Sequence, residues 1–110
     1  MQIVDEIISR IVSGILNPGQ RLPSTRDLAV EAGVNLNTAQ RAYTELEARQ
    51  VLITQRGNGR FVVDDCELLK RLKNDILEKE ISLFADKMKS LGVEYKDVSK
   101  IIEKYMTEED

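Results

Sequence analysis

Two predicted helices are separated by a turn of only about three residues, and this spacing constrains the fold more than any other feature. Ser24 is a candidate N-cap for the first of these helices, expected over about residues 24–32. Gly33 ends it, and Asn35 is a candidate N-cap for the second, expected over about residues 36–49. Two helices joined by so short a glycine-containing turn are typical of a helix-turn-helix.

The segments on either side of this pair complete a known order of elements. Apolar residues at helical spacing predict a first helix over residues 3–16. After the pair, residues 51–55 and 60–63 are rich in β-branched and aromatic side chains, and predict two short strands. Three helices followed by a hairpin predict a mostly α-helical winged helix-turn-helix. The residues of the pair expected to face its core are Leu28, Ala29, Ala39, Ala42, Tyr43 and Leu46.

A second, helical region is expected to follow. Asp64-Asp65 marks the expected boundary between a winged-helix DNA-binding domain at 1–63 and a dimerisation region at 64–110, with helices over about 66–91 and 95–106. Two helices alone bury too little apolar surface for a core, so they must pack on the winged helix, on another chain, or on both. We predict that they form a homodimer. The apolar residues expected at its interface are Leu69, Leu72, Ile76, Leu77, Ile81, Phe84, Met88, Ile101, Ile102 and Tyr105.

Charge is divided unevenly along the chain. The formal net charge is −3, but residues 1–63 contain seven arginines, no lysine and six acidic residues, for a net charge of +1. Residues 64–110 carry −4. Arginine is the cation best suited to bidentate contacts with phosphate and guanine, so the first part is the candidate DNA-binding part. Chance codon usage explains the same bias about equally well.

The residue types present exclude several classes of function. The 110 residues include no histidine and one cysteine, Cys66, so the usual nucleophile–base pairs and metal-ligand sets are missing. We therefore expect no enzyme activity, no cofactor and no metal. Apolar runs are too short to cross a membrane, and Asp5 and Glu6 interrupt any signal peptide. Together with the lone cysteine, these features predict a cytoplasmic protein with no membrane partner.

Several blocks of sequence, in order and at matching spacing, resemble one family of bacterial proteins. The blocks are residues 14–29, 33–38, 41–47 and 56–62. Over about residues 1–63, the chain resembles the GntR family of transcription regulators. Val-Asn-x-Asn-Thr at 34–38 and Arg-Ala-Tyr at 41–43 are similar to the YtrA-type subfamily, which has a short two-helix C-terminal region. The resemblance implies a dimer on a double-stranded, palindromic DNA operator, most simply a repressor, with target operons that encode transporters.

The chain departs from the family pattern at three places. Gln50 stands where glycine usually closes the recognition helix, so this helix either ends in another way or continues by half a turn. Leu36 stands where arginine is frequent, which removes one contact with DNA. The short segment with an aromatic residue that usually precedes the first helix is missing before Met1 or was removed.

The candidate DNA-binding residues fall in three groups. The second helix of the pair reads base edges in the major groove from its N-terminal end. It contributes Asn35, Asn37, Thr38, Gln40 and Arg41. The N-terminus of the first helix favours phosphate contacts, and contributes Ser24, Thr25 and Arg26. The hairpin tip suits the minor groove, and contributes Arg56, Gly57, Asn58, Gly59 and Arg60.

Each of these groups has a structural alternative. The residues of the second helix are also explained as an N-cap and solvated side chains. Arg26 is explained by a surface salt bridge with Asp27 or Glu31, and the tip by an ordinary hairpin. For the whole protein, the alternative is a winged helix that binds a protein partner without specific DNA binding.

A small-molecule effector is the partner that the sequence specifies least. It is expected between the C-terminal helices or at their junction with the winged helix, where it would shift the spacing of the recognition helices. Tyr95, Tyr105, Phe84 and Met88 are candidates to line its pocket, although their helical phase favours packing in a core.

Overall fold

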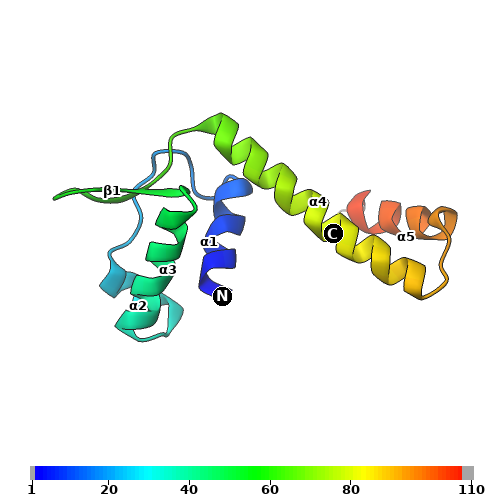
Figure 1. The fold of residues 1–110 in the computed structure, drawn as a ribbon, viewed down its shortest axis with the longest axis horizontal. Helices are drawn as coiled ribbons and strands as arrows, with labels where there is room; N and C mark the ends of the chain where they lie inside the picture. The colour runs from blue at the N-terminus through cyan, green and yellow to red at the C-terminus, as the bar shows by residue number, and fades with distance from the viewer. Residues whose placement is uncertain (1, 108–110) are drawn as a thin grey trace. The chain divides into compact units, whose positions relative to one another are not determined.

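The computed structural model describes residues 2–107 in two compact units, of which the first ends at Lys73 and the second begins at Asn74. Within these residues, three helices, a hairpin and two further helices follow one another (Figure 1). Their bounds are α1 Gln2–Val12, α2 Thr25–Ala32, α3 Leu36–Ala48, β1 Leu52–Gln55, β2 Gly59–Val62, α4 Cys66–Ser90 and α5 Tyr95–Thr107. The predicted class, a mostly α-helical winged helix-turn-helix followed by two C-terminal helices, is confirmed.

The core of the first unit is built around α3, which contacts α1, α2 and β1. Figure 1 shows α1 and α3 side by side. On the inner face of α3, the small Ala39 and Ala42 are fully buried, which lets the neighbouring helices approach closely. The apolar faces of α1, α2 and the hairpin close over Tyr43 and Leu46. The inward residues predicted for α2 and α3 are therefore confirmed.

Side-chain caps start both helices of the pair, as predicted. The Asp27 N–H donates to Ser24 Oγ at 3.1 Å, and the Thr38 N–H donates to Asn35 Oδ1 at 2.8 Å. Each cap satisfies a backbone N–H that the first turn of a helix leaves without an internal partner. These two short side chains therefore fix where α2 and α3 begin.

Helix α1 ends at Val12, earlier than the predicted end at residue 16. Gly14 adopts a φ of +89°, a left-handed conformation that breaks the helix. As a result, Ile15 leaves the apolar stripe and is 69% exposed. The helical spacing of apolar residues continues past the break by coincidence, so spacing alone misplaced the end.

Helix α3 ends in the conformation that glycine usually provides, although Gln50 occupies the position. Gln50 has a φ of +64°, and its N–H donates to the Glu47 carbonyl at 2.9 Å. The Val51 N–H donates to the Leu46 carbonyl at 3.0 Å, which completes a Schellman motif. The helix therefore ends as it would with glycine, and neither of the two expected alternatives describes it.

Gln50→Gly should stabilise the first unit by about 0.5–1 kcal/mol in urea unfolding, because a side chain in the left-handed region costs about 1–2 kcal/mol. The gain is partial, since glycine also raises the entropy of the unfolded chain. Arg49→Gly is the matched control, because Arg49 has a φ of −81° and gains nothing from glycine. An equal effect of the two substitutions would contradict the strain at Gln50.

Strands β1 and β2 form the predicted antiparallel hairpin. Leu52 lies opposite Val62, and Gln55 lies opposite Gly59. The second strand therefore starts at Gly59, one residue before its predicted start, and takes this residue out of the loop. Side chains alternate along the strand, so Arg60 and Val62 lie on one face of β2 and Phe61 lies on the other.

A third extended segment, residues 19–22, pairs with the other edge of β2. The Val62 N–H donates to the Gln20 carbonyl at 2.8 Å, and the Leu22 N–H donates to the Arg60 carbonyl at 2.8 Å. This segment was not predicted, because four residues are too few to show an alternating pattern. The available signal was Pro23, which favours extended backbone at the residue before it.

The second unit has no buried side chain within its described residues, 74–107. Leu69, predicted on the dimer stripe, is 9% exposed in the single chain and lies in the first unit, which extends to Lys73. Tyr95 and Tyr105 are exposed and not packed in a core of the single chain. The exposed large apolar residues of this unit are Leu77, Ile81, Leu83, Phe84, Leu91, Val93, Tyr95, Ile101, Ile102, Tyr105 and Met106.

The longest helix, α4, is interrupted by charged residues throughout. Among residues 2–107, no helix combines the length and the apolar character that crossing a membrane requires.

Candidate nucleic-acid interface

The outer face of α3 presents polar side chains directly opposite its buried face. Asn37, Gln40 and Arg41 lie at helical spacing on this face, and all three are exposed. Asn35, at the start of the helix, is also exposed while its side chain caps the Thr38 N–H. The Thr38 residue itself is half-buried. The structure therefore brings four of the five predicted residues of α3 to the solvent.

Three arginines of the first unit are open to an anionic partner. Arg26 in the first turn of α2, Arg41 on α3 and Arg56 at the wing tip are exposed. Among residues 2–107, none of these three takes part in an ion pair. The salt bridge considered for Arg26 is therefore not formed, and its charge is available to a phosphate.

The wing tip carries Arg56, Gly57 and Asn58, all exposed. Gly59, which begins β2, has a φ of +107°, and a Cβ at this position would lie 3.1 Å from Arg21 Nε. Glycine is favoured here by its conformation, whereas the exposed Arg21 side chain could move to make room for a Cβ. Arg21 was not predicted as a site residue, and no local pattern marks it. Its exposed guanidinium lies beside the wing because residues 19–22 pair with β2.

Arg60 was predicted with the wing tip, but its side chain turns toward α3 and is only 19% exposed. Residues two apart on a strand share a face, and Arg60 shares the inner face of β2 with buried Val62. Its guanidinium carbon lies 4.8 Å from the centre of the Tyr43 ring, in a cation–π contact. Arg60 Nε lies 3.7 Å from Glu47 Oε1.

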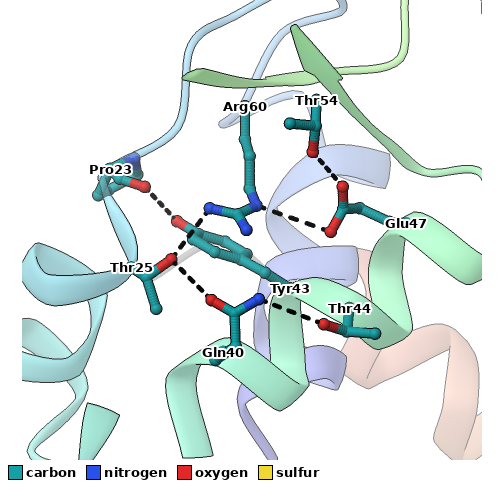
Figure 2. Close-up of polar contacts among 8 residues, drawn as sticks. All are labelled: Pro23, Thr25, Gln40, Tyr43, Thr44, Glu47, Thr54 and Arg60. Carbon is teal, nitrogen blue, oxygen red and sulfur yellow. Dashed lines mark hydrogen bonds and ion pairs between the residues drawn. The ribbon is translucent and has the colours of Figure 1, made fainter. Parts of the chain in front are cut away.

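Figure 2 shows the polar contacts that surround this arginine. Arg60 Nη1 donates to Thr25 Oγ1 at 2.9 Å, and the Thr25 hydroxyl donates to Gln40 Oε1 at 3.3 Å. On the other side, the Thr54 hydroxyl donates to Glu47. The network joins the start of α2, polar side chains of α3 and both strands of the wing. It brings together Thr25, Gln40 and Arg60, three of the predicted site residues.

Tyr43 links the network to the segment that precedes α2, because its ring contacts Arg60 and its hydroxyl contacts Pro23. Its hydroxyl donates to the Pro23 carbonyl at 2.6 Å. Burial raises the pKa of Tyr43 to about 12; the Arg60 charge acts in the opposite direction, and Glu31 and Asp27 raise the pKa further. The phenol therefore remains a hydrogen-bond donor at neutral pH.

The pKa of Tyr43 predicts a loss of stability at high pH. An unfolded tyrosine ionises near pH ~10, so from about pH 10 to about pH 12 the unfolded state releases a proton that the folded state retains. Stability falls as pH rises through this window, by about 2–3 kcal/mol from Tyr43 alone. Tyr43→Phe should lose about 1 kcal/mol at neutral pH but show a flatter decline, measured by urea unfolding. Exposed Tyr95→Phe is the control and should follow the wild-type curve.

The chemistry of this surface suits a polyanion. The first unit carries exposed side-chain amides on α3, a serine hydroxyl at the start of α2, and exposed guanidinium groups. Such groups contact phosphates and base edges. Within the described residues, no group of histidine, cysteine, aspartate or glutamate side chains is arranged to hold a metal ion.

An exposed recognition helix, its partner helix and an arginine-bearing wing define a winged helix-turn-helix DNA-binding protein. Residues 1–62 match the family described as bacterial regulatory proteins, gntR family. The chain belongs to the GntR family, whose members are DNA-binding transcription regulators and not enzymes.

Relatives match most of the chain. The HTH-type transcriptional regulator YhcF of Bacillus subtilis is 39% identical over 93 residues, which are 84% of this chain and 77% of YhcF. The HTH-type transcriptional repressor YtrA of the same organism is 30% identical over 93 residues, 84% of this chain and 67% of YtrA. A GntR family regulator from Listeria monocytogenes has a similar structure, with a TM-score of 0.89 at 36% identity over 94% of this chain and 90% of its own. The similarity to YtrA confirms the YtrA-type assignment.

Proposed function

We propose that this protein represses transcription by binding a palindromic DNA operator as a homodimer. The observation that carries the proposal is the exposed face of α3 with Asn37, Gln40 and Arg41, in one unit with a wing whose Arg56 makes no ion pair among residues 2–107. The similarity to a protein named a transcriptional repressor supports the direction of regulation.

Each exposed group has a role that follows from its place. Asn37, Gln40 and Arg41 read base edges in the major groove, because asparagine and glutamine pair with adenine and arginine with guanine. Arg26 and the start of α2 bind phosphate, helped by the dipole of that helix. Arg56 and the small residues at the wing tip enter the neighbouring minor groove.

The homodimer is supported by the second unit, which leaves its apolar side chains uncovered. Leu77, Ile81 and Phe84 recur at helical spacing on α4, and all three are exposed. A large exposed apolar surface marks an interaction site. A second copy of the same surface covers both at once, since a two-fold interface is self-complementary.

The YtrA-type resemblance supplies the finer parts of the proposal. The operator would precede an operon that encodes a transporter, and the protein would act in the cytoplasm. A small-molecule effector that binds the C-terminal helices would change the separation of the two recognition helices, and with it the affinity for the operator.

A gel-shift titration tests the function. The probe is the DNA immediately upstream of the protein's own gene, with random duplex as competitor, at several salt concentrations. We expect a shift that survives the competitor, with log K falling by about 0.9 per phosphate contact per unit of log salt. A folded dimer with no salt-dependent shift would instead favour a winged helix that binds a protein partner.

Arg41→Ala should weaken specific binding by about 1–3 kcal/mol, roughly 5- to 150-fold, with the fold and the dimer unchanged. The reason is that Arg41 is exposed on the outer face of α3, which we call the reading face. It forms no ion pair among residues 2–107 that its contact with DNA would have to replace. Arg49→Ala is the matched control, because Arg49 lies at the end of α3 and pairs with Glu45. Equal losses for the two variants would show that the reading face is misplaced.

A further inference from the structure

Arg60 is the one wing arginine that is held inside its own unit. Its Nε atom is buried without a hydrogen-bond partner, and its guanidinium covers the Tyr43 ring. A charge placed in this way is unsuited to contact phosphate, because reaching DNA would break the contacts with Tyr43, Thr25 and Glu47. Its contacts lead instead to a residue on the reading face of α3.

The hydrogen bonds from Arg60 have a fixed direction. A guanidinium only donates, so Thr25 Oγ1 accepts from Arg60 Nη1 at 2.9 Å. The Thr25 hydroxyl proton then points to Gln40 Oε1 at 3.3 Å, and Gln40 Nε2 faces Thr44 Oγ1 at 3.5 Å. The positive charge of Arg60 favours the same arrangement, because it attracts the carbonyl end of the Gln40 amide. Figure 2 shows this chain of contacts from the wing to α3.

A glutamine amide that is free to rotate presents its donor and acceptor in either order. The amide of Gln40 is instead held with its oxygen toward α2 and its nitrogen toward Thr44. One lone pair and one N–H remain for a base. Adenine presents an N7 acceptor beside an N6 donor in the major groove, and a glutamine amide in one fixed order pairs with both.

We propose that Arg60 is a positioning residue for base recognition, which acts through Thr25 to fix the amide of Gln40 so that Gln40 selects adenine. Arg60 itself makes no phosphate contact. The inference rests on the proposed function, since it requires that α3 reads an operator. It assigns sequence specificity to a side chain of the wing that does not touch the DNA.

The test compares the sequences that variants select from one pool of randomised duplex DNA. Wild-type protein should enrich adenine at one position of each half-site, and Gln40→Ala identifies this position by losing the preference. Arg60→Met and Thr25→Val should reduce the adenine preference there by roughly tenfold and leave the other positions unchanged. Thr25→Ser keeps the hydroxyl and should keep the preference.

Salt dependence separates positioning from direct contact. For Arg60→Met, the slope of log K against log salt should equal the wild-type slope, whereas loss of a phosphate contact would reduce it by about 0.9. A reduced slope with uniform weakening across all sequences overturns the proposal. So does an intact adenine preference in Thr25→Val, which leaves Arg60 on Tyr43 and carries the test if Arg60→Met does not fold. If wild-type protein enriches no sequence, the proposed function fails, and this inference fails with it.

Discussion

Ile81→Glu should convert the proposed dimer into a monomer and weaken operator binding by about 100-fold or more. Ile81 is 57% exposed in the single chain, so the substitution leaves the folded chain intact. In a two-fold symmetric dimer the change occurs on both chains, and two carboxylates would be buried without partners. Each unpaired buried charge costs several kcal/mol, which exceeds what the remaining apolar contacts of a small interface supply.

Sedimentation and gel shift measure the two consequences together. Ser82→Glu is the matched control, because Ser82 is the next residue of α4, is exposed and lies off the row formed by Leu77, Ile81 and Phe84. This variant should remain dimeric and bind as the wild type does. If Ile81→Glu also remains dimeric, the interface does not include this row, and the proposed dimer is wrong.

Leu46→Ala should destabilise the first unit by about 2–5 kcal/mol. Leu46 is 0% exposed at the centre of the core, where α3 contacts α1, α2 and β1. Truncation leaves a cavity that these elements cannot fill without losing other contacts. For a domain whose total stability is about 5–15 kcal/mol, this is a large share, and thermal unfolding should shift down by several degrees or more.

The preceding residue provides the control for Leu46. Glu45 is exposed and makes one surface ion pair with Arg49, so Glu45→Ala should change stability by less than about 1 kcal/mol. Calorimetry on both variants compares a core and a surface truncation one residue apart. Similar shifts would mean that the buried face of α3 is misassigned.

The parts of the fold that could be predicted are those set by nearby residues. Ser24 and Asn35 cap helices within three residues of themselves, and the inner face of α3 repeats every turn. The end of α1 depends on a backbone conformation at Gly14 that apolar spacing does not reveal. The pairing of residues 19–22 with β2 depends on residues far along the chain, so no local pattern carries it.

The same distinction applies to the candidate site. The exposed positions of Asn37 and Arg41 follow from the helical period of α3, and were predicted with it. The inward turn of Arg60 depends on strand register and on the ring of Tyr43 beneath it, which are tertiary features. Leu69 has apolar neighbours at helical spacing like the rest of its stripe, and only packing shows that it belongs to the first unit.

The pairing of residues 19–22 with β2 also bears on how the domain folds. It closes a loop of roughly 40 residues, so it raises contact order and is slower to form than the turns between helices. Helix α3 lies inside this loop, and both β2 and the early segment contribute buried side chains, Val62 and Leu22, to one core. We therefore expect the domain to complete its core during synthesis only after β2 has left the ribosome, and the helix-turn-helix and the wing to unfold together.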